Sequence, residues 1–133
     1  RTYFYTSIQT FKHGLFMLNE IFKTIPQTIP YDGVIYNVTI KVHESIATDW
    51  LDWLKNEHIP EVIQTGCLTN ATILKIAETD DSEGPTYAIQ YLAPGKAIYN
   101  LYIEKFAGIM RQKSFDKWGD KFIAFRTVMH IVN

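Results

Sequence analysis

The sequence predicts an α+β fold whose elements follow the order β-α-β-β-α-β over residues 34–133. Two observations carry this prediction. Four short stretches alternate apolar and mixed residues as half-buried strands do, and two longer stretches space their apolar residues as helices do. Two crossovers of the usual right hand then give a four-stranded antiparallel sheet with both helices on one face, the ferredoxin-like arrangement.

The first strand is predicted at 34–42, a β-branched run, and the first helix at 46–65. The apolar residues of this helix fall within one arc of about 120°, and His58 lies in that arc. Pro60 has no N–H to bond the carbonyl four residues earlier, and it disfavours the α conformation at Ile59. We therefore expect a kink beside the histidine.

The second and third strands, 68–79 and 85–93, form a hairpin around an acidic turn at 80–85. The second helix covers 95–119, and 121–132 is the last strand. One apolar stripe of this helix is expected to face the sheet: Ile98, Leu101, Tyr102, Phe106, Ile109 and Met110.

If the more apolar side of each strand faces the helices, the other face of the sheet is semi-polar. It then carries Asn37, Thr39, Lys41, Ala88, Gln90, Leu92, Ala124, Arg126 and Val128. That face keeps more apolar surface than a small monomer usually exposes. We expect a homodimer in which two such sheets pack face to face and form a barrel.

Composition limits the partners and the compartment. The formal net charge of −1 gives no general attraction to nucleic acid or to an anionic membrane, and neither is predicted as a partner. Cys67 is the only cysteine, which rules out a disulfide within this sequence and favours a reducing cytoplasm. His43 and His130 lack the spacing of metal ligands, so we predict no metal and no cofactor.

Residues 1–33 are predicted to be an N-terminal extension of the 34–133 domain. Apolar residues have helical spacing over 7–23, and a linker with Pro26 and Pro30 follows. We expect this extension to be accessory, or to have no stable place in the fold.

His58 has two interpretations. Its ordinary pKa lies near neutrality, so a core-facing ring beside a proline is a candidate catalytic base or a polar anchor for a ligand. The other interpretation is a core histidine bonded to a carbonyl that Pro60 leaves free. Local spacing fixes no second catalytic group, because Glu57 lies about 100° round the helix.

The helix-facing side also carries candidate ligand-binding tyrosines, namely Tyr36, Tyr87, Tyr91 and Tyr102. Aromatic walls with a few hydroxyls suit a small planar ligand, and they equally describe an aromatic core. Arg126 lies in the middle of the last strand. It is a candidate clamp for an anion or carboxylate, and an ion pair within or between subunits is the alternative.

Several motifs carry a family resemblance: Val34-Ile35-Tyr36-Asn37-Val38-Thr39, Asn56-Glu57-His58-Ile59-Pro60-Glu61-Val62, Thr86-Tyr87-Ala88-Ile89-Gln90-Tyr91 and Gly119-Asp120-Lys121-Phe122-Ile123-Ala124-Phe125-Arg126-Thr127. With them the chain resembles, from Val34 onward, a family of small bacterial proteins classed as a domain of unknown function, of ferredoxin-like, dimeric α/β-barrel type. The resemblance implies this fold and no established activity. Members of the family typically begin at the first strand, so the 1–33 extension departs from their pattern.

More distantly, the pair His58 and Pro60 is similar to the first helix of the wider dimeric α/β-barrel superfamily. That superfamily includes cofactor-independent monooxygenases, haem-degrading enzymes and small isomerases, and in several members a pocket lies between helices and sheet. Three functions therefore stay open: a protein that binds a small organic molecule, a cofactor-independent oxygenase or isomerase with His58 as general base, and a structural dimerisation module.

Overall fold

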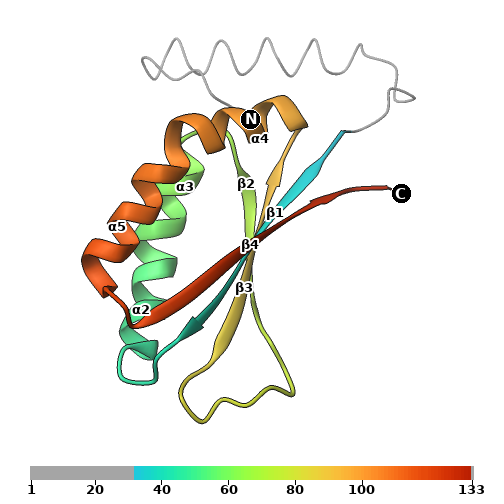
Figure 1. Ribbon diagram of the computed structural model, residues 1–133. Coiled ribbons are helices and arrows are strands. Elements are labelled where there is room, and N and C mark those ends of the chain that lie inside the picture. Colours follow the sequence, from blue (N-terminus) through green and yellow to red (C-terminus); the bar gives the residue numbers. More distant parts are fainter. Residues whose placement is uncertain (1–31, 133) are drawn as a thin grey trace.

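The computed structural model describes residues 32–132 and confirms the predicted ferredoxin-like topology. The strands form one antiparallel sheet in the order β2-β3-β1-β4, and the helices cover one of its faces (Figure 1). Their bounds are Val34–Val42 for β1, Thr69–Lys75 for β2, Thr86–Ala93 for β3 and Phe122–His130 for β4. The extension predicted over residues 1–33 lies outside the described residues, except for its last two positions.

Each of the two helical stretches contains one π-helical turn. The first stretch consists of α2 (Ala47–Trp53), the π turn η1 (Leu54–His58) and α3 (Ile59–Gln64). The second consists of α4 (Lys96–Tyr102), the π turn η2 (Ile103–Ala107) and α5 (Gly108–Trp118). No helix within residues 32–132 is both long and apolar enough to span a lipid bilayer.

The chain around Pro60 is irregular in a different way from the one predicted. Ile59 keeps α-helical angles, with φ −59° and ψ −46°, so the expectation that proline displaces it from the α region is wrong. Instead, the Ile59 N–H donates to the carbonyl of Leu54, five residues earlier. Because Pro60 lacks an N–H, one α-type hydrogen bond is missing at this point in any case, and the wider turn accommodates the loss.

The π turn in the second helix shifts its buried face. Tyr102, Ala107 and Met110 are buried, whereas Leu101 and Ile109 are 38% and 55% exposed. The predicted stripe is therefore wrong at Leu101 and Ile109. A π turn adds one residue to the helix, so the contact positions move from 102 to 107 rather than to 106, and Ile109 turns towards solvent. Leu101 precedes the turn, which does not account for its exposure.

The face assignment of β4 is also wrong. Val128, Arg126 and Ala124 lie opposite Tyr36, Val38 and Ile40, so all three point to the helix side. The outer face of β4 instead carries Ile123, Phe125, Thr127 and Met129. Composition favoured the wrong side, because the set with Ile123, Phe125 and Met129 is the more apolar one, and only the pairing with β1 decides.

The main core lies between the helices and the sheet. Its largest fully buried side chains come from both layers: Trp50, Leu54, Leu68, Ile89, Val34, Val42, Val62 and Cys67. Trp50 stacks on Tyr87 with ring centroids 5.6 Å apart, which joins the start of the first helix to β3. This packing fixes the first helix above the middle of the sheet.

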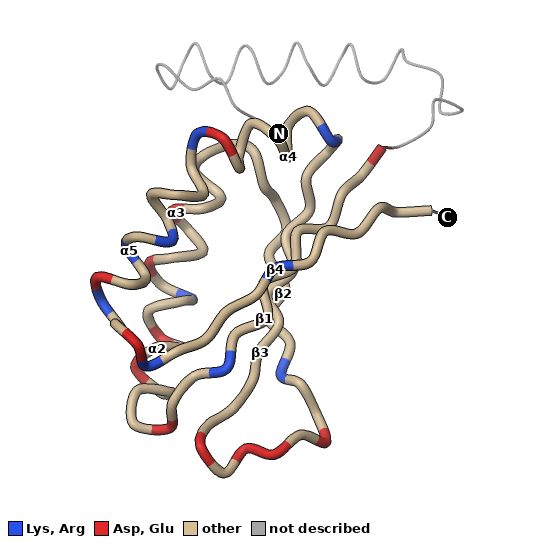
Figure 2. Tube along the Cα trace, viewed as in Figure 1, with Lys and Arg blue, Asp and Glu red and all other residues tan. Residues whose placement is uncertain are grey.

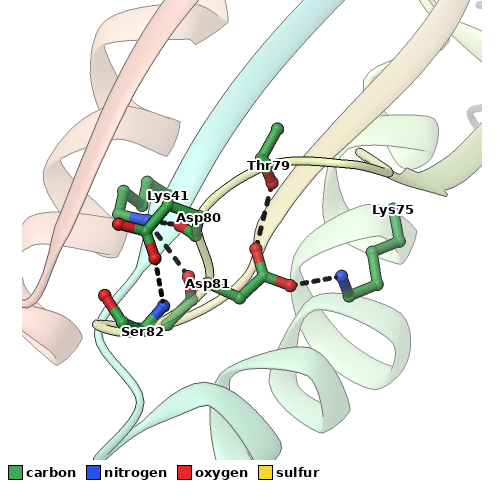
Figure 3. A network of polar contacts seen from close by, with 7 residues as sticks. Lys41, Lys75, Thr79, Asp80, Asp81 and Ser82 are labelled. Carbon is green, nitrogen blue, oxygen red and sulfur yellow. Dashed lines mark hydrogen bonds and ion pairs between the residues drawn. The ribbon is translucent and has the colours of Figure 1, made fainter.

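A polar network holds the acidic loop between β2 and β3 against β1 (Figure 3). The Lys41 ammonium donates to the carbonyls of Asp80 and Gly84, at 3.1 Å each. Lys75 pairs with Asp81 at 2.7 Å. The charged turn expected from the sequence is thus tied to the sheet through one lysine of the central strand.

The shifted register of the second helix predicts a contrast between two neighbouring residues. Met110→Ala should lower the free energy of unfolding by about 2 kcal/mol or more, because it removes a buried side chain. Ile109→Ala should change it by less than about 0.5 kcal/mol, because Ile109 faces solvent. Urea unfolding of both variants measures the difference, and equal losses would contradict the π-shifted register.

Candidate functional site

A cavity of about 240 Å³ lies between the helices and the sheet. Both π turns contribute to its wall, η1 through Leu54 and His58 and η2 through Ala107. The residues that line it are Tyr36, Val38, Ile40, Leu54, His58, Val62, Ile89, Tyr91, Tyr102, Ala107, Met110, Arg111, Ser114, Phe122, Ala124 and Arg126. An apolar cavity of about 150 Å³ holds benzene, so this space admits one substituted ring.

His58 stacks on Trp53, with ring centroids 4.7 Å apart and an interplanar angle of 24°. Its Nδ1 atom is buried and has no hydrogen-bond partner within the described part of the chain. Burial lowers the pKa of His58 to about 4, with Lys113 and Arg126 acting in the same direction and Glu61 opposing them. The imidazole is therefore neutral at pH 7.

Glu61 is the carboxylate whose charge raises the pKa of His58, but it forms an ion pair with Lys113. Its Oε2 accepts from Lys113 Nζ at 2.6 Å, an ion pair that joins α3 to α5. No hydrogen bond between described residues joins a carboxylate to His58, and the imidazole lacks the orienting acid of a catalytic dyad.

Three of the predicted tyrosines meet in the cavity. Tyr36 and Tyr91 face each other on paired strands with ring centroids 6.2 Å apart, and Tyr102 from α4 lies 5.7 Å from the Tyr36 ring. Burial raises the pKa of Tyr91 and of Tyr102, so both hydroxyls stay protonated at physiological pH. The fourth candidate, Tyr87, packs against Trp50 and is not among the lining residues.

Arg126 also lines the cavity, and it comes from β4, which lies at the edge of the described sheet. Its Nε donates to the Tyr36 hydroxyl at 3.1 Å. This contact joins side chains 90 positions apart in the sequence. The ion pairs between described residues involve neither Arg126 nor Arg111.

Two polar lining residues were not predicted from the sequence, namely Arg111 and Ser114 of α5. Under uninterrupted α-helical spacing they fall outside the predicted stripe. The π turn rotates α5 by one residue and brings them towards the sheet. Only a signal for the π turn itself could have found them.

The structure also bears on metal binding. Within residues 32–132, no three or more His, Cys, Asp or Glu side chains are grouped so that they could hold a metal ion. The polar groups of the cavity are instead a neutral imidazole, hydroxyls and two guanidinium groups.

Sequence comparison places the chain in a known family. Residues 33–132 match the family described as Domain of unknown function (DUF4286). The chain belongs to this family. A comparison of the sequence with curated proteins gives no match.

Solved structures with the same fold accompany this DUF4286 assignment. SnoaB, a cofactor-independent oxygenase from Streptomyces nogalater, is similar with a TM-score of 0.57 and 9% identity, over 77% of this chain and 95% of SnoaB. A conserved protein of unknown function from Bacteroides thetaiotaomicron, described as a possible oxidoreductase, is similar with a TM-score of 0.56 and 11% identity, over 77% of this chain and 100% of its own. At these identities the likeness shows the fold alone.

The buried histidine of this DUF4286 chain predicts a specific pH dependence. Unfolded His58 takes up a proton near its ordinary pKa of 6.5, whereas folded His58 does so only near 4. The unfolded state thus binds more protons as the pH falls between these values, which lowers the free energy of unfolding by up to about 3 kcal/mol.

Urea unfolding of the wild type and of His58→Asn between pH 7 and pH 4 measures this term. The variant should gain about 1 to 3 kcal/mol on the wild type as the pH falls, because carboxylates titrate in both and cancel. A difference that stays constant with pH would contradict a buried neutral imidazole.

Proposed function

We propose that this protein binds a small, ring-containing organic molecule in the cavity between helices and sheet, with His58 as its polar anchor. One observation carries the proposal: His58 lines the cavity, and its buried Nδ1 has no partner among the described residues. A buried polar atom without a hydrogen bond is costly. A ligand hydroxyl both donates and accepts, so it pairs with Nδ1 in either tautomer.

The shape of the cavity supports the same class of ligand. Tyr36, Tyr91 and Tyr102 give it aromatic walls with hydroxyls at their tips, and aliphatic side chains make up much of the remainder. Small-molecule sites combine such apolar walls with a few polar groups that fix orientation. The volume of about 240 Å³ suits one ring with short substituents rather than a large cofactor.

A cofactor-independent oxygenase or isomerase with His58 as general base is the alternative. The neutral imidazole favours it, since this is the form that accepts a proton, and SnoaB is an oxygenase of this kind on the same fold. The low pKa of about 4 argues against it, because the surroundings that keep His58 neutral also make it a weak base. Binding is therefore preferred over catalysis.

We also propose that the protein forms a homodimer through the outer face of the sheet, in a bacterial cytoplasm. Ile123 and Phe125 stand 71% and 62% exposed on that face. Near its centre Asn37 is only 7% exposed, and its Oδ1 has no partner among the described residues. A second copy would cover the exposed apolar side chains of this face. The free, buried thiol of Cys67 is compatible with a reducing compartment.

His58→Ala tests the binding proposal. His43→Ala is the matched control, because the His43 ring is exposed and, among the described residues, bonds only Ser45. Phenol, titrated against the protein and followed by NMR chemical shifts, serves as the probe. We expect His58→Ala to weaken phenol binding about tenfold, the value of one hydrogen bond to a ligand, and His43→Ala to leave it unchanged.

The same titration separates the alternatives. Unchanged phenol affinity in His58→Ala contradicts the anchor role. A large loss of stability without loss of affinity supports a structural module instead.

Phe125→Asp tests the dimer. Light scattering at micromolar concentration should give the mass of two chains for the wild type and of one chain for this variant, since a charge is then buried in the interface. Ile109→Asp is the control, because Ile109 is comparably exposed but lies on the helix layer. A single-chain mass for the wild type would contradict the dimer.

A further inference from the structure

We propose that the cavity selects anions, and that its ligand is a single aromatic ring bearing a carboxylate, with the carboxylate against Arg126 and Arg111. This inference rests on the ligand cavity proposed above and narrows its ligand to one chemical class.

The charged side chains that line the cavity are both positive. Among the described residues, the lining includes two arginines and neither aspartate nor glutamate. The chain as a whole carries a formal charge of −1, so this excess is local. Figure 2 shows acidic residues gathered on the loop between β2 and β3, which contributes no residue to the lining. A pocket lined by positive charge raises the local concentration of anions.

Arg126 is already oriented for such a ligand. Its Nε is used by the Tyr36 hydroxyl at 3.1 Å, and this contact holds the guanidinium plane. The terminal nitrogens make no hydrogen bond or ion pair within the described residues. Two parallel N–H groups of a guanidinium match the two oxygens of a carboxylate.

The Tyr36 hydroxyl adds a second donor to the same place. Because its oxygen accepts from Arg126, its own proton is available to a ligand oxygen. Tyr102 lies next to Tyr36, and both Arg111 and Arg126 act on it to lower its pKa against the larger effect of burial. Both arginines line the same cavity, Arg111 from α5 and Arg126 from β4.

No acid among residues 32–132 forms an ion pair with either arginine of the cavity. The ion pairs between described residues are Lys75 with Asp81 and Lys113 with Glu61. The carboxylate that raises the pKa of His58 is therefore already paired with Lys113. His58 stays neutral, so it offers a hydrogen bond to a ring substituent and does not compete for the anionic group.

Benzoate and benzamide form a matched pair of probes, equal in shape and different in charge. We expect the wild type to bind benzoate about tenfold more tightly than benzamide at pH 7 in an NMR titration, because both arginines are exposed and water screens part of their attraction. Arg126→Gln should reduce this preference to about threefold or less. Lys105→Gln removes one exposed positive charge from η2 outside the lining and should keep the full preference.

Each other result overturns the inference in a distinct way. Equal affinity of the wild type for benzoate and benzamide would contradict the preference for an anionic ligand but not the proposal that the cavity binds a ring. If neither ring binds, the proposal that the cavity binds a ligand is contradicted as well. A preference that persists in Arg126→Gln excludes Arg126 as the clamp, and Arg111→Gln provides the second variant should Arg126→Gln fail to fold.

Discussion

β1 forms hydrogen bonds along both of its sides, to β3 and to β4, and its register decides which side chains enter the space beneath the helices. Pairing places Tyr36 opposite Tyr91 and Val38 opposite Arg126, so the aromatic wall and the guanidinium of the cavity both follow from one central strand. A slip of one residue would turn every one of these side chains to the other face. The site therefore depends on backbone pairing before it depends on any side-chain contact.

Much of the fold was predictable because the patterns that indicate its strands, turns and helices each lie within a short stretch of sequence. The β-branched run of β1, the acidic turn after β2 and the apolar arc around His58 each lie within a few turns or residues, where periodicity is informative. The direction of His58 towards the sheet follows from the same arc, and the cavity lining agrees with it.

Features that depend on distant partners were not predictable. The more apolar side of β4 faces away from the helices, so composition misleads and only the pairing with β1 identifies the side that faces them. The contact between Arg126 and Tyr36 is non-local, and neither residue signals the other. The π turn at Ile103–Ala107 has no proline, and nothing in its residue types distinguishes it from an α-helix. The positions of Ile109, Arg111 and Ser114 relative to the sheet all followed from that turn.

The position of Arg126 has a consequence for solubility. Within the described residues β4 is an edge strand, and one row of its N–H and C=O groups is free to pair with a strand of another chain. Exposed Phe125 would make such sheet extension favourable. A charged side chain that points inward from an edge strand opposes it, because an added strand would have to desolvate the guanidinium. The charge that we propose to bind a ligand would thus also oppose aggregation through this sheet edge.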